Sequence, residues 1–124
     1  MGQTVCAGFP SPAESYTEDP LDLNQLLVRR PAATYFVRVA GDSMIGDGIH
    51  PGDLLVVDRS LSAVDGSVVI AAVDGEFTVK RLRRGPSGPC LEAANPAYPA
   101  LRFSEGMELQ LFGVVTAVIH TLVP

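Results

Sequence analysis

The sequence predicts a mainly β domain with one short helix. Apolar runs rich in β-branched and aromatic residues recur along the chain, as is typical of strands. Asp-Gly dipeptides precede or separate several of these runs, and Asp-Gly between apolar runs is a strong hairpin signal. With 47% hydrophobic residues among 124, the chain suits a single domain with a real core.

Residues 1–18 are predicted to form a flexible N-terminal arm, because prolines and glycines lie close together there among polar residues with no sustained period. Within the arm, Val5-Cys6-Ala7-Gly8 places small residues around one peptide bond. Small side chains would let that bond lie extended in a tight cleft. Residues 19–124 are expected to form the folded domain.

A helix is predicted to begin just after the arm. Asp19 is the expected N-cap and Pro20 the first helical residue, a common pairing at helix starts. The helix should end before Arg30-Pro31, because the residue preceding a proline is disfavoured in the helical conformation. Three leucines fall on one face: Leu23, Leu26 and Leu27.

Strands and turns are predicted for the rest of the chain. Asp74-Gly75 should connect a hairpin whose second strand carries Lys80. A loop rich in glycine and proline is expected at 83–89, and a turn at 95–99. The final run is apolar on both faces, which favours a central core strand or a strand at a dimer interface. Strands are expected at 34–39, 54–57, 67–71, 75–82 and 109–119.

Ser43 is the candidate nucleophile. It follows the run 34–39 and the turn signal Gly41-Asp42, which would place its hydroxyl at the mouth of the sheet. Free backbone N–H groups there, those of Asp42 and Ser43, could form an oxyanion hole. The alternative is that Ser43 only caps a helical turn beginning at Met44.

A serine hydroxyl needs a base to take its proton. Eight of the nine basic residues are arginine and only Lys80 is lysine. Burial would lower its pKa, so that it could act as a base near neutral pH; the alternative is an exposed strand lysine. Neither His50 nor His120 comes with an evident orienting carboxylate, which leaves a Ser-His-Asp triad unsupported.

Composition argues against several other functions. A net charge of −5 and 6% aromatic residues disfavour direct nucleic-acid binding, and the basic cluster 80–84 is interpreted as a solvated strand end. No run reaches membrane-spanning length and residues 1–4 do not resemble a signal peptide, so a cytoplasmic protein is expected. Cys6 and Cys90 are expected to be free thiols, with no metal-ligand cluster and no cofactor.

From about Val5 to about Val118 the chain resembles the UmuD-type proteins, self-cleaving SOS mutagenesis factors related to the C-terminal domain of LexA repressors. The resemblance implies the curved antiparallel sheets of that fold, with Ser43 as nucleophile and Lys80 as general base. It also implies a homodimer, stimulation by a RecA-type recombinase filament, and a UmuC-type translesion polymerase as partner. It is carried by segments 8–13, 22–27, 34–37, 41–45 and 72–80.

The family is cut just before a glycine, so the resemblance makes Ala7/Gly8 the candidate self-cleavage bond. Two alternatives are a non-cleaving module that binds a polymerase and the C-terminal domain of a LexA-type repressor. A full repressor would need a helix-turn-helix domain ahead of the arm, and seven residues before Gly8 cannot hold one. A UmuD-like protein is therefore expected.

Overall fold

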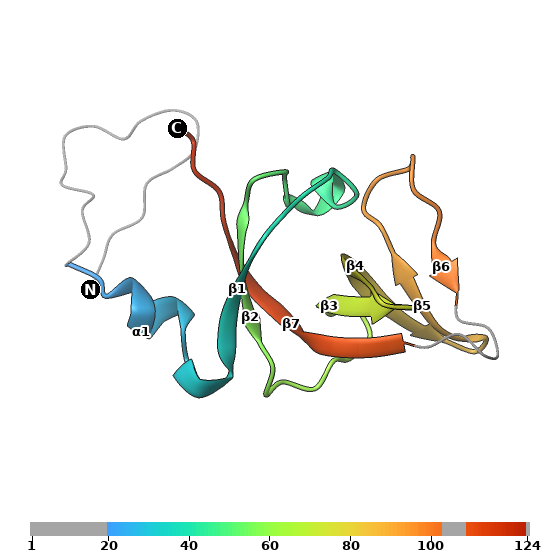
Figure 1. Cartoon of the computed structure of the whole chain (residues 1–124), viewed down its shortest axis with the longest axis horizontal. Helices are drawn as coiled ribbons and strands as arrows, with labels where there is room; N and C mark the ends of the chain where they lie inside the picture. The colour runs from blue at the N-terminus through green and yellow to red at the C-terminus, as the bar shows by residue number, and fades with distance from the viewer. Residues whose placement is uncertain (1–19, 103–108, 124) are drawn as a thin grey trace, which may run out of the picture.

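The computed structural model describes residues 20–102 and 109–123, and these form a mainly β structure with one short helix (Figure 1). This confirms the predicted fold class. None of the helices in this part of the chain has the length and apolar character needed to cross a membrane. The elements are α1 (Leu23–Leu27) and strands β1 (Thr34–Arg38), β2 (Leu54–Asp58), β3 (Val68–Val73), β4 (Glu76–Gly85), β5 (Gly88–Glu92), β6 (Leu101–Arg102) and β7 (Leu109–Ile119).

Within the described residues, the seven strands form one antiparallel sheet in the order β1-β2-β7-β3-β4-β5-β6. The last strand of the sequence therefore lies inside the sheet, between β2 and β3, as predicted for a central strand, although Gly113 is its only buried residue. Its register with β2 skips Thr116, and its register with β3 skips Phe112. Such bulges increase local twist, and Figure 1 shows β7 bending as it runs from β3 to β2.

The predicted helix start is wrong. Helix α1 begins at Leu23, and its N-cap is Asp22, whose carboxylate accepts a hydrogen bond of 2.9 Å from the Asn24 N–H. Pro20 precedes the helix, and Asp19 lies outside the described residues. A side-chain acceptor at the N-cap satisfies a backbone donor of the first turn, and Asp22 supplies it three positions after the predicted cap.

Two hairpins bring β3, β4 and β5 together. The Asp74-Gly75 turn is confirmed, with φ of 50° and 87°, the left-handed conformation required at both central positions of a type I′ turn. The predicted loop at 83–89 is wrong, because Gly85 pairs with Gly88 and only residues 86–87 form the turn. Pairing of β4 with β5 extends β4 through the arginines that composition alone placed in a loop.

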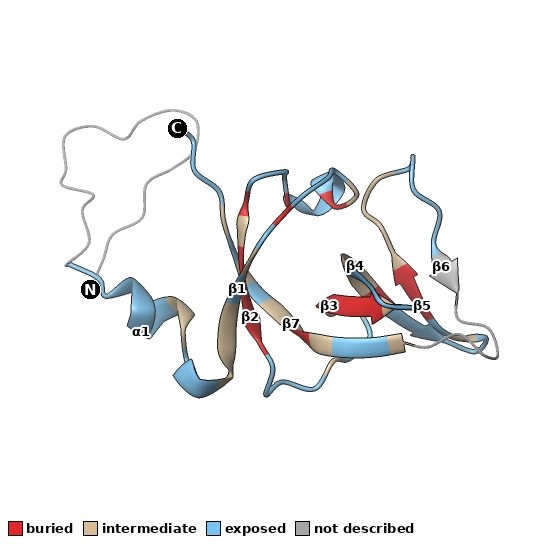
Figure 2. Ribbon diagram, in the orientation of Figure 1, coloured by how far each residue is buried: buried red, intermediate tan, exposed pale blue. Residues whose placement is uncertain are grey.

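The core lies along β2, β3 and β5, as the buried segments in Figure 2 show. One cluster also includes Met44 and Ile49, which are 1% and 2% exposed although they lie in the loop between β1 and β2. Burial of these two side chains anchors the loop that carries Ser43.

Candidate active site

Ser43 lies in the loop after β1, just before a 3-10 turn at Ile45–Asp47. The turn packs closely against the segment after β5, because the Gly46 N–H donates a 2.7 Å hydrogen bond to the Ala94 carbonyl. A Cβ atom on Gly46 would lie 2.5 Å from that same oxygen. Only glycine fits this approach without displacement of the backbone.

Asp42, next to Ser43, is also held by the segment after β5. The side-chain amide of Asn95 donates to the Asp42 carbonyl at 3.0 Å, and the Tyr98 hydroxyl donates to the Asp42 carboxylate at 2.7 Å. The second contact raises the pKa of Tyr98. The predicted turn at 95–99 therefore supports the backbone on which Ser43 stands.

Lys80 enters the site from β4, where it pairs in register with Val69 of β3. Its Nζ donates to Ser43 Oγ at 3.0 Å, to Thr78 Oγ1 at 2.6 Å and to the Val79 carbonyl at 3.1 Å. Lys80 is half-buried, and this burial lowers the pKa of its ammonium group. The recorded acceptors are neutral oxygens, so no carboxylate among them offsets the cost of burying the charge.

The contact between Lys80 and Ser43 tests the two alternatives from the sequence, in which Ser43 only caps a helical turn and Lys80 is an exposed strand lysine. The N-cap of the turn is Met44, and no side chain caps it, so capping does not explain Ser43. Lys80 is not an exposed strand lysine, since it is half-buried against the serine. The structure thus brings the two sequence-predicted residues into hydrogen-bond contact across 37 positions of sequence.

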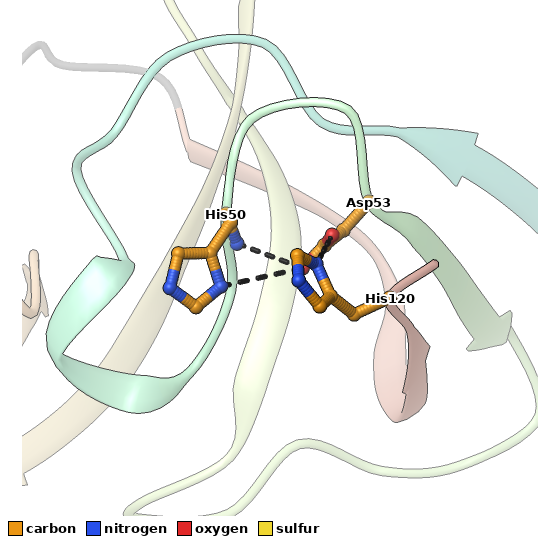
Figure 3. Close-up of side chains that lie close together, drawn as sticks. All are labelled: His50, Asp53 and His120. Carbon is orange, nitrogen blue, oxygen red and sulfur yellow. Dashed lines mark hydrogen bonds and ion pairs between the residues drawn. The ribbon is translucent and has the colours of Figure 1, made fainter. Parts of the chain in front are cut away.

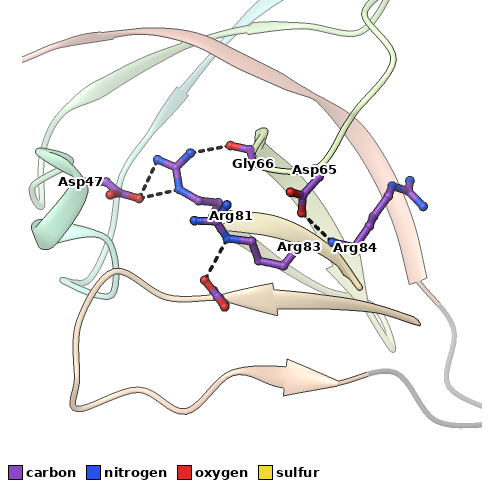
Figure 4. A network of polar contacts seen from close by, with 7 residues as sticks. Asp47, Asp65, Gly66, Arg81, Arg83 and Arg84 are labelled. Carbon is purple, nitrogen blue, oxygen red and sulfur yellow. Dashed lines mark hydrogen bonds and ion pairs between the residues drawn. The ribbon is translucent and has the colours of Figure 1, made fainter. Parts of the chain in front are cut away.

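The residue after Lys80 fixes the far end of the loop (Figure 4). Arg81 donates to Asp47 Oδ2 from Nη2 at 2.8 Å and from Nε at 3.0 Å, and it also bonds the Gly66 carbonyl. Arg83 pairs with Glu92 at 3.1 Å. Two arginines of the basic cluster of β4, Arg81 and Arg83, therefore form ion pairs within the fold.

The predicted oxyanion donors have no competing partner in the part of the chain that the structure describes. Neither the Asp42 nor the Ser43 N–H donates to an acceptor there. An oxyanion hole needs such unoccupied donors beside the nucleophile. The assignment stays a prediction, and so does the cleavage bond, because Ala7, Gly8 and the whole arm lie outside the described residues.

An apolar cleft adjoins the Ser43–Lys80 pair. A cavity of about 200 Å³ lies between residues 37–40 and the start of β4, and its lining includes Thr78 and Val79, which Lys80 Nζ contacts. It shares lining residues with a second cavity of about 480 Å³. The shared residues are Val37, Ile70 and Phe77.

Neither histidine contacts Ser43 in the described part of the chain. His50 and His120 both lie against Asp53 (Figure 3). The sequence showed no evident carboxylate partner for either histidine, and the structure places Asp53 beside both. Asp53 is 3% exposed and accepts the His50 backbone N–H at 2.8 Å, the main cause that lowers the pKa of its carboxyl. The position of Asp53, three residues after His50, was the sequence signal that could have indicated this contact.

The amino-acid sequence matches a known protein family. Residues 1–116 match the model of the peptidase S24-like family. The chain is 60% identical to protein SamA of Salmonella typhimurium over 92% of this chain and 79% of that protein. It is 48% identical to protein MucA of Escherichia coli over 98% of this chain and 81% of that protein.

A more distant relative is the LexA repressor of Anaeromyxobacter dehalogenans, at 39% identity over 95% of this chain. The match spans 53% of that repressor, whereas it spans about four fifths of SamA and MucA. These relatives confirm the resemblance that the sequence motifs indicated. The chain belongs to the peptidase S24-like family, as a UmuD-like member with an SOS mutagenesis role.

Proposed function

We propose that the protein is a serine peptidase that cuts its own N-terminal arm at the Ala7/Gly8 bond, with Ser43 as nucleophile and Lys80 as general base. The observation that carries the proposal is the 3.0 Å contact between Lys80 Nζ and Ser43 Oγ. Because burial lowers the pKa of this lysine and the recorded acceptors are neutral, a larger share of it is unprotonated at a given pH. Only the neutral amine can accept the serine proton.

The reaction follows the general chemistry of an activated serine. The Ser43 hydroxyl proton passes to Lys80 Nζ as Oγ forms a bond to the Ala7 carbonyl carbon. The backbone N–H groups of Asp42 and Ser43 stabilise the oxyanion. The C–N bond then breaks and Lys80 returns its proton to the Gly8 amine. Water hydrolyses the Ser43 ester, which releases residues 1–7 and leaves a chain that begins at Gly8.

The cleft supports a peptide substrate in extended form. Its lining residues are mainly apolar, and they include Thr78 and Val79, whose oxygen atoms accept hydrogen bonds from Lys80 Nζ. An extended segment laid there would bring a carbonyl to Ser43, and the small residues Ala7 and Gly8 suit a close approach of the main chain. We assign the arm of this chain, or of a second copy, as the occupant.

The family membership supports the wider role. We propose that a RecA-type filament on single-stranded DNA promotes cutting by favouring the arm conformation that enters the cleft, which is a shift of populations and adds no chemistry. After trimming, the protein acts as a homodimer and joins a UmuC-type translesion polymerase. The basic cluster 80–84 gives little support for DNA as a direct partner, because Arg81 and Arg83 are already paired with acidic residues of the same chain.

The test is the intact mass of purified protein over time at about pH 10, where more of the lysine is neutral. Loss of residues 1–7 in the wild type, and not in Ser43→Ala or Lys80→Ala, is the expected result. If the wild type stays whole, also with activated recombinase filament, self-cleavage is refuted and the alternative of a non-cleaving, polymerase-binding module takes its place.

A further inference from the structure

A second cluster of chemically active side chains lies where β2 begins and β7 ends. Leu54 pairs with Ile119 across the two strands, so Asp53, just before one, and His120, just after the other, are brought side by side. The turn before β2 adds His50, whose Nδ1 lies 3.8 Å from Asp53 Oδ2. Figure 3 shows the Asp53 carboxylate beside the His120 ring, and the centroids of the two histidine rings lie 5.0 Å apart.

The three side chains have the chemistry and spacing of metal ligands. Each offers one ligand atom, and these atoms all lie within 4.8 Å of one another. Two imidazole nitrogens and a carboxylate oxygen are a donor set that binds Zn²⁺, with bonds of about 2.0–2.2 Å. Tetrahedral bonds of that length place ligand atoms roughly 3.4 Å apart, so the most distant pair would approach by up to about 1.4 Å (4.8 − 3.4) when an ion binds.

The burial of the three residues also fits a metal site. Asp53 is fixed, because its side chain is 3% exposed and its Oδ2 accepts the His50 N–H. The histidine side chains are 48% and 44% exposed, so they can turn toward an ion that arrives from solvent. The contact between His120 Nδ1 and Asp53 Oδ1 already holds the second ring beside the carboxylate, and an ion bound between these two atoms would replace that contact.

We propose that His50, Asp53 and His120 form a binding site for a divalent transition metal ion of the zinc class. Three protein ligands leave at least one position for water. The ion would join the end of β7 to the turn that supports the active-site loop, because Val39 exchanges backbone hydrogen bonds with Asp53 at 2.8 Å and Gly52 at 2.9 Å. The bound ion would stabilise the folded protein, and this effect does not depend on self-cleavage.

The test is calorimetric titration of the untagged, full-length protein with Zn²⁺ in a non-chelating buffer. Saturable 1:1 binding is expected, and His50→Gln or His120→Gln should weaken it by about 100-fold or more, since loss of even an outer partner costs 10–100-fold. Both variants should fold, because each ring is about half exposed. Zn²⁺ should also raise the Tm of the wild type and leave that of the variants unchanged.

Glu76→Gln is the matched control, because it removes an exposed carboxylate of β4 that is not part of the cluster and should leave the Zn²⁺ affinity unchanged. Mg²⁺ should not compete, since it prefers oxygen ligands and near-ideal octahedral geometry. The proposal is overturned if the wild type shows no saturable Zn²⁺ binding, or if either histidine variant binds as tightly as the wild type.

Discussion

Gly46→Ala probes how closely the active-site loop must be placed. The new Cβ would lie 2.5 Å from the Ala94 carbonyl oxygen, whereas ordinary contacts begin at 3.4 Å, so the two segments must part by 0.9 Å (3.4 − 2.5). This movement breaks the 2.7 Å hydrogen bond from the Gly46 N–H. Ser43 lies three positions earlier in the same loop and would shift from Lys80.

The expected magnitudes follow from that displacement. The lost hydrogen bond and the overpacking should together lower the free energy of unfolding by about 2–3 kcal/mol. A misplacement of about 1 Å can slow a reaction on the order of 100-fold. We therefore expect Gly46→Ala to fold and to release residues 1–7 at a rate reduced by about 10- to 100-fold.

The assay is the intact-mass time course at high pH, with urea unfolding of the same samples. Gly85→Ala is the matched control, because no atom lies within 4 Å of its added Cβ and its φ is also not in the left-handed region. A folded Gly46→Ala protein that cleaves at the wild-type rate would refute the idea that this contact positions Ser43.

Three further predictions concern the sheet and the site. Gly113→Ala should lower the free energy of unfolding by about 2–4 kcal/mol in urea, because its φ is 155° and its Cβ would lie 2.6 Å from Val57 Cγ1; an unchanged midpoint would contradict this. Asp47→Asn removes the Arg81 ion pair and should cost about 0.5–1 kcal/mol and slow cleavage several-fold, whereas equal rates would show that the loop does not need it. Lys80→Met should stabilise the fold at neutral pH. Because the pKa of Lys80 is lowered in the folded protein, the stability of the wild type rises with pH toward 10.5, and the advantage of Lys80→Met should shrink at pH 10. Urea titrations of both proteins at the two pH values test this, and an unchanged difference in the free energy of unfolding would disprove it.

Local sequence signals predicted a helix, strand or hairpin best where a single turn dipeptide or apolar run determines where that element begins and ends. Asp74-Gly75 predicted the hairpin, and the apolar run 109–119 matches β7 at both ends. The loop at 83–89 failed because pairing between β4 and β5 outweighed the glycine and proline content. Local composition does not report such cross-strand contacts.

The sites depended on contacts that are distant in sequence. Ser43 and Lys80 were singled out by residue type, yet their approach requires the loop after β1 to pack over β4, which the family resemblance implied and the residues alone did not. The cluster at Asp53 was missed because His120 reaches it only through the pairing of β2 with β7. Neither contact has a short sequence motif.

The proposed self-cleavage depends most on Lys80 acting as the base for Ser43, and this role can be measured directly. Lys80 is the only lysine, so protein labelled with ¹⁵N-lysine gives a single side-chain amine signal. The Ser43→Ala variant should stay whole while this signal is titrated, and the wild type supplies the cleavage rate at each pH.

We predict a Lys80 pKa below its usual 10.5, because burial disfavours the ammonium form. The cleavage rate should rise with pH through one deprotonation whose midpoint matches that pKa. A lysine that titrates at its ordinary value, or a rate that follows a different midpoint, would contradict the assignment of Lys80 as the general base.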